Sequence, residues 1–119
     1  NVHYPPKPAY AMVDKEKAGI AFLNIIINAI ESMQEGVGIL TIVISSSNDR
    51  HDIKIQDNGC GMDEETCRRL FEPYFTSKPT GLGLGLATTN AILQSHKATI
   101  AVDSRPGEGT TFTISFTSL

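Results

Sequence analysis

An acid followed by two closely spaced glycines, at the exit of an alternating segment, is the feature that most restricts this chain. Residues 51–56 place Ile53 and Ile55 on one face and polar side chains on the other, which is the period of a half-buried strand. The motif Asp-Asn-Gly-Cys-Gly follows at 57–61. Asn-Gly often marks a hairpin turn. No second strand follows at once, however. The alternative is a ligand site, because the two glycines would let the backbone come close to a bound ligand.

Composition restricts the class of protein. The 119 residues include 40% hydrophobic and 19% charged side chains, which is typical of one soluble domain with its own core. A net charge of −3 argues against nucleic acid and anionic membrane surfaces as partners. No apolar run approaches the ~18 residues of a membrane span, so we expect no direct membrane contact. Cys60 and Cys67 lack zinc-site spacing and predict reduced thiols in a cytoplasmic domain, whose parent protein could still be anchored in a membrane.

The order of elements predicts an α+β fold. The chain begins at Asn1 rather than Met, so we expect a piece of a longer protein, with a proline-rich linker at 1–9 and one domain at 10–119. Strands are predicted at 10–13, 39–46, 51–56, 98–102 and 110–117. Helices are predicted at 15–33 and at 84–95. A short helix is predicted where residues 62–65 lead into 67–70, with an acid near its start as its cap. This order favours helices layered on a sheet.

The helix predicted at 15–33 carries an unusual polar stripe. Asp14 is its expected N-cap, and its apolar content predicts that it is largely buried. Its polar residues recur at steps of seven, four, three and four, which places them on one stripe: Lys17, Asn24, Asn28, Glu31 and Glu35. A solvated face is the ordinary interpretation. Asparagine is a poor helix former, however, and two carboxamides four residues apart can reach one ligand together.

Two adjoining segments complete the candidate site. Residues 71–82 contain two prolines, aromatic residues and Lys78, and are either a lid over a ligand or a packed surface loop. The run Gly81-Leu82-Gly83-Leu84-Gly85 opens the third helix, where free amides and the helix dipole attract anions. It is not a Walker loop, and Leu86 stands where a dinucleotide fingerprint needs glycine.

Taken together, these motifs resemble the ATP-binding catalytic domain of bacterial two-component sensor histidine kinases. Residues 23–29 resemble the asparagine box of that family, and residues 57–61 its first glycine box. Residues 71–75 resemble its phenylalanine box, and residues 81–85 its second glycine box. The superfamily also includes gyrase, the ninety-kilodalton heat-shock chaperone and mismatch-repair ATPases. The resemblance implies a two-layer α/β sandwich in which about three helices cover one face of a mixed, mainly antiparallel sheet.

The resemblance also implies roles for individual residues. Asp57 would accept a hydrogen bond from the amine of adenine, Gly59 and Gly61 would leave room for the base, and Thr110 would support it. Asn28, helped by Asn24, would hold Mg²⁺. With Lys78 as a γ-phosphate contact, these two asparagines form the implied catalytic set. The remaining implied contacts to ATP are Met62, Phe71, Phe75, Thr76, Gly81, Leu82, Gly83, Leu84, Gly85 and Leu86.

One departure bears on the reaction. Relatives that hydrolyse ATP carry a glutamate base where this chain has Asn24, which cannot accept a proton. Transfer to a protein acceptor is therefore favoured over hydrolysis. His3 precedes two prolines, His51 starts a strand and His96 ends a helix, so none of the three resembles a phosphoacceptor. The expected partner is a dimerisation domain with a phosphoacceptor histidine, in the same protein before residue 1 or on another chain, with a response regulator as an indirect partner. A nucleotide-dependent interaction module and an anti-sigma-type serine kinase are the alternatives.

Overall fold

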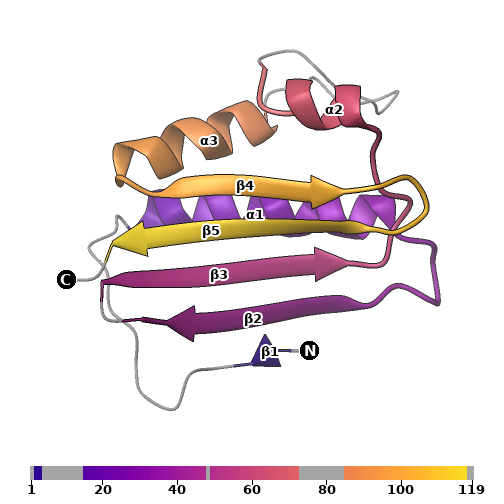
Figure 1. Ribbon diagram of the computed structural model, residues 1–119, viewed down its shortest axis with the longest axis horizontal. Coiled ribbons are helices and arrows are strands. Elements are labelled where there is room, and N and C mark those ends of the chain that lie inside the picture. The colour runs from indigo at the N-terminus through magenta and orange to yellow at the C-terminus, as the bar shows by residue number, and fades with distance from the viewer. Residues whose placement is uncertain (1, 4–14, 48, 73–84, 118–119) are drawn as a thin grey trace.

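A computed structural model describes residues 2–3, 15–47, 49–72 and 85–117 of the chain. These residues contain one five-stranded sheet in the order β1-β2-β3-β5-β4 (Figure 1). Its strands are β1 (Val2–His3), β2 (Leu40–Ser46), β3 (Arg50–Asp57), β4 (Thr99–Ser104) and β5 (Thr110–Thr117). The short edge strand β1 pairs with β2 in parallel, and all other pairs are antiparallel.

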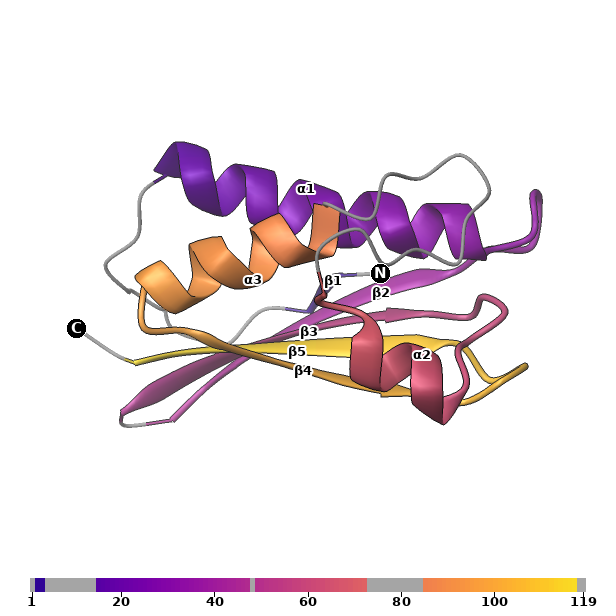
Figure 2. The same cartoon turned by 90° about the horizontal axis from the view of Figure 1, so that it is seen from above.

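The helices form a second layer on one face of this sheet. Helix α1 (Lys15–Ser32) lies behind the strands in Figure 1, and α3 (Gly85–Ser95) lies beside α1, above β4 in that view, on the same side of the sheet (Figures 1 and 2). The short helix α2 (Glu64–Arg69) lies near the β4 edge. The predicted fold class is therefore confirmed: an α+β sandwich with a mixed, mainly antiparallel sheet. This arrangement brings the end of β3, the C-terminal half of α1 and the start of α3 to one region of the molecule.

The core lies between the two layers. Alternation along β5 directs Phe112, Ile114 and Phe116 toward the helices, as the sequence predicts, and all three are buried. Ile25 of α1 and Leu93 of α3 meet them from the other side. Full burial of such a side chain contributes roughly 1.5–3 kcal/mol, so this contact layer holds the helices on the sheet.

The prediction that α1 is largely buried is wrong. Only one side of the helix rests on the sheet, through Ala21, Ile25 and Ala29, while four apolar residues on other sides are exposed: Ile20, Leu23, Ile27 and Ile30. An apolar sequence cannot reveal which faces find a neighbour. The helix also ends at Ser32, so Glu35 lies beyond it, outside the predicted polar stripe.

Other boundaries differ by one or two residues. Helix α2 has an acidic cap near its start, as predicted, and the structure identifies the cap as Asp63: its carboxylate accepts a hydrogen bond from the amide of Thr66 at 2.7 Å. The strand β2 is half-buried rather than mostly buried. Val2 and His3 form an edge strand within the segment expected to be a linker. The predicted strand at 10–13 and the cap Asp14 lie outside the described residues.

Candidate functional site

Asp57 is the acidic residue at the centre of the candidate site. It ends β3, and only 3% of its surface is exposed. One carboxylate oxygen, Oδ1, accepts a hydrogen bond from the backbone amide of Gly59 at 2.8 Å. The neighbouring position on β5 is Thr110, which is 4% exposed. Directly opposed residues of antiparallel strands point to the same face, so the carboxylate and the Thr110 hydroxyl are neighbours at one end of the sheet.

Ser104 holds this end of the sheet together. Its hydroxyl donates to the carbonyl of Gly109 at 2.9 Å and accepts from the amide of Met62 at 2.8 Å. It also lies 2.7 Å from the hydroxyl of Thr110. A serine hydroxyl has one proton, and here that proton is on the Gly109 bond, so Thr110 must be the donor to Ser104. The lone pairs of Thr110 are then oriented as acceptors.

The two glycines of the 57–61 motif make close contacts with other parts of the chain. A Cβ atom on Gly59 would collide with the Ser32 side chain and would come within 2.6 Å of the Ser32 carbonyl oxygen. Gly61 has φ +70° and lies against the backbone of Arg105. The loop therefore runs between the end of α1 and the β4–β5 turn. The predicted role of these glycines in admitting a base stays a prediction.

Asn58 fixes the connection between α1 and β2. Its Oδ1 accepts from the amide of Ile39 at 2.8 Å, and its Nδ2 donates to the carbonyl of Val37 at 3.0 Å. No sequence pattern indicates these roles of Asn58, or the contacts of Ser32 and Ser104. Asn58 and its partners are separated by 19 or more residues in the sequence, and Ser104 and Met62 are separated by 42. Local sequence patterns carry no signal at such separations.

The polar stripe of α1 faces the start of α3. Asn24 donates from Nδ2 to the carbonyl oxygen of Gly85 at 3.1 Å. Asn28 lies one turn further along on the same face, and both asparagines are partly buried. Because Asn24 uses its amide nitrogen for Gly85, its Oδ1 is the atom left to meet a cation or donor. Two carboxamides and a helix N-terminus therefore lie together.

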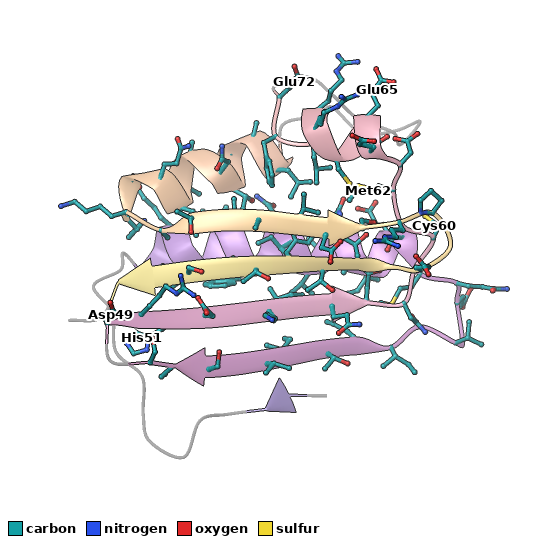
Figure 3. All side chains as sticks on the ribbon, in the orientation of Figure 1. Asp49, His51, Cys60, Met62, Glu65 and Glu72 are labelled. Carbon is teal, nitrogen blue, oxygen red and sulfur yellow. The ribbon has the colours of Figure 1, made fainter. Side chains whose placement is uncertain are left out.

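The other predicted contacts fall into two groups. Met62, Phe71 and Leu86 are partly buried and pack against the core beside the site. Figure 3 shows Met62 and Cys60 at the end of the sheet where the β4–β5 turn lies, whereas His51 is at the opposite end. The rest lie outside the described residues: Phe75, Thr76, Lys78, Gly81, Leu82, Gly83 and Leu84.

Two features are absent from the part of the chain that the structure describes. Within it, no cluster of three or more His, Cys, Asp or Glu side chains could hold a metal ion by itself. In the same part of the chain, no helix has the length and apolar content needed to cross a bilayer.

Comparison with known proteins identifies this arrangement. Residues 13–118 match the family described as histidine kinase-, DNA gyrase B-, and HSP90-like ATPase. The sequence is 38% identical over 113 residues to Sporulation kinase A of Bacillus subtilis (strain 168), covering 95% of this chain and 18% of that protein. It is 40% identical over 101 residues to the signal transduction histidine-protein kinase AtoS of Escherichia coli (strain K12), covering 85% of this chain and 17% of AtoS.

Solved structures agree with the sequence comparison. The mycobacterial sensor histidine kinase MprB superposes with a TM-score of 0.82 at 26% identity, covering 91% of this chain and 74% of that one. The catalytic domain of histidine kinase ThkA gives a TM-score of 0.80 at 25% identity, covering 91% of this chain and 70% of ThkA's. The fold is that of an ATPase domain, a class of domain that binds nucleotide. The chain belongs to the histidine kinase-, DNA gyrase B-, and HSP90-like ATPase family, and among its members it is similar to the catalytic domains of sensor histidine kinases.

Proposed function

We propose that this domain binds Mg-ATP and delivers the γ-phosphoryl group to a histidine on a separate helical domain of the same protein, in two-component signalling. The observation that carries the proposal is the buried carboxylate of Asp57 beside Thr110. The loop that follows Asp57 packs against Ser32, one helical turn beyond Asn28 on α1. In this proposal the domain acts in the cytoplasm, and a response regulator receives the phosphoryl group from the histidine.

Adenine recognition follows from the acceptors at the end of β3. An ionised carboxylate can only accept hydrogen bonds, and Oδ1 of Asp57 already accepts one from Gly59. Its remaining lone pairs suit the exocyclic amine of adenine. Guanine carries a carbonyl oxygen where adenine carries this amine. That oxygen would face the Asp57 carboxylate, and neither group has a proton to share in a hydrogen bond. Leaving buried polar groups unpaired in this way is costly, so adenine is favoured.

Phosphate binding would fall to α1 and α3. The N-terminal end of α3 carries positive dipole charge, and Asn24 fixes its first residue, Gly85. Mg²⁺, when bound, supplies charge neutralisation between the phosphates. Asn28 and Oδ1 of Asn24 are the side-chain oxygens of this chain that would hold it. Lys78, the predicted γ-phosphate contact, lies outside the described residues. Its part in the proposal therefore rests on the sequence alone.

None of the three histidines of this chain is placed as a phosphoryl acceptor, so the proposal takes the acceptor histidine from another domain. His51 lies on β3, at the end of the sheet away from Asp57 (Figure 3), and His3 lies on the edge strand β1. His96 follows the end of α3, where Nδ1 is 2.8 Å from the carbonyl of Ile92. Asn24 cannot serve as a base for water. These features favour transfer to another domain over hydrolysis.

Calorimetric titration with ATP, with and without Mg²⁺, tests the proposal. We expect ATP to bind more tightly with Mg²⁺, and Asp57→Asn to weaken ATP and ADP at least tenfold. The matched control is Asp49→Asn, an exposed aspartate at the far end of the sheet, which should bind normally (Figure 3). Equal affinities of Asp57→Asn and the parent chain for ATP would refute the adenine assignment.

A further inference from the structure

Helix α1 carries an exposed apolar stripe on the side away from the sheet. Its members are Ile20, Leu23, Ile27 and Ile30, which are 50%, 56%, 44% and 56% exposed. Isolated exposed apolar residues are common, but a contiguous row of large ones marks an interaction surface. These four residues form such a row from Ile20 to Ile30, along the middle and C-terminal part of the 18-residue helix.

The spacing of the apolar stripe indicates what it binds. Steps of three, four and three residues are the a, d, a, d positions of two heptads, with isoleucine at both a positions. The stripe runs along one side of the helix for about 15 Å, at 1.5 Å per residue. A narrow seam of this kind receives the apolar seam of another helix, whose side chains insert between those of the first.

The flanks of the apolar stripe differ from each other. Asn24 and Glu31 follow one flank at the e positions, and Ile26 follows the other at a g position. The Asn24 flank is the one joined to the start of α3. A helix lying in the seam would therefore run beside the face of α1 that we assign to Mg²⁺ and the phosphates.

We propose that the apolar stripe of α1 docks a helix of the histidine-bearing domain and so brings the acceptor to the phosphate end of the site. This inference rests on the proposed function. The supporting observations are the heptad spacing, the exposure of all four side chains, and the adjoining Asn24 flank.

The length of the apolar stripe distinguishes a tethered partner from a second copy. Two heptads bury too few side chains to hold two free chains together, since coiled coils are sustained over about three to four heptads. A partner in the same polypeptide works at an effective concentration in the millimolar range, where a short seam suffices. The matched region is only 18% of Sporulation kinase A and 17% of AtoS, so these relatives have most of their length available for such a partner.

The test uses the full native polypeptide that contains this chain and its histidine domain. We expect Leu23→Gln/Ile27→Gln to lower the initial rate of histidine phosphorylation from labelled ATP at least tenfold, at saturating Mg-ATP. Glutamine keeps the helix propensity and removes only the apolar seam. The conservative pair Leu23→Met/Ile27→Leu should retain the parent rate. The matched control is Val37→Gln/Ile39→Gln, which alters equally exposed apolar residues, 60% and 55%, outside the stripe and should also retain it.

Nucleotide titration and sedimentation velocity complete the test. ATP affinity should be the same in the parent and the seam variant, so a lost rate then reports docking alone. No ATP binding by the parent would refute the proposed function and this inference with it. Normal binding with an undiminished phosphorylation rate in the seam variant would overturn only the docking surface. Concentration-dependent self-association of the 119-residue chain that the seam substitutions abolish would assign the stripe to a second copy and overturn the inference as well.

Discussion

The side-chain amide of Asn24 donates to the carbonyl oxygen of Gly85 at 3.1 Å, and this bond joins the middle of α1 to the first residue of α3. The two residues are 61 positions apart in the sequence. The contact sets the distance between the carboxamide that we assign to Mg²⁺ and the helix end that we assign to the phosphates. It is therefore a structural link between two halves of the candidate site.

Replacing Asn24 by Asp tests this link. The substitution keeps the shape of the side chain but places an acceptor against the Gly85 carbonyl, so the hydrogen bond is lost and two acceptors face each other. A net hydrogen bond contributes about 0.5–1.5 kcal/mol, and we expect the free energy of unfolding to fall by about that amount. Urea unfolding measures it, with the exposed Gln34→Glu as a control for added charge near α1. Equal losses in both variants would contradict a specific role for the Asn24–Gly85 bond.

Ser104→Ala removes the hydroxyl that connects Met62, Gly109 and Thr110. The amide of Met62 and the carbonyl of Gly109 would each lose a partner at a partly buried position. Leaving such groups unsatisfied costs about 1–3 kcal/mol, and Thr110 would lose the acceptor that orients it. We expect lower stability by urea unfolding and weaker ATP binding by calorimetry. Ser45→Ala, at an exposed position of β2, should alter neither, and normal ATP affinity in Ser104→Ala would show that the orientation of Thr110 is unimportant.

Alanine substitutions at Gly61 and Gly107 would distinguish the cost of backbone strain from the cost of a steric clash. Both have positive φ, +70° and +79°, but a Cβ on Gly61 would collide with the Arg105 backbone while one on Gly107 meets nothing within 4 Å. Alanine at Gly107 should cost about 1–2 kcal/mol for left-handed backbone alone. Gly61→Ala should cost clearly more and should also weaken ATP binding, because the 57–61 loop must move. Thermal unfolding of the two variants gives the comparison, and similar losses would exclude a packing role for Gly61.

The contribution of the Asp63 cap to the stability of the fold should depend on pH. Its hydrogen bonds with Thr66 lower the pKa of the Asp63 carboxyl. A carboxyl whose pKa is lower in the folded state stabilises that state above the unfolded pKa, and this contribution is lost as the pH falls through the folded pKa. Asp63→Ala should therefore be less stable than the parent at neutral pH, and the difference should shrink in strong acid. Urea unfolding across that range measures both, and a difference independent of pH would argue against ionic capping.

Elements with strong periodicity were predictable from sequence, and long-range contacts were not. Alternation placed β3 and β5 within one residue of their observed bounds, and an acid near the start of α2 was expected as its cap, which is Asp63. The apolar content of α1 wrongly predicted burial, because sequence does not show that the sheet reaches only one side of a helix. Asp57 and Asn24 are singled out by their motifs, and their roles stay predictions, whereas Ser104 and Ser32 make contacts with partners that only the fold brings together.

The two cysteines should differ in reactivity. Cys60 is exposed, whereas Cys67 on α2 is partly buried, and burial raises the pKa of its thiol, with Asp63, Asp103 and Glu64 adding like-charge repulsion. The thiolate is the reactive form, so a raised pKa and limited access both slow alkylation of Cys67. Iodoacetamide at pH 8, followed by mass spectrometry of the peptides, should modify Cys60 first, and raising the pH should increase the rate at Cys67. Unfolding in urea should make the two rates similar, because burial and the neighbouring carboxylates are then removed. Faster modification of Cys67 than of Cys60 in the folded chain would contradict the environment described for α2.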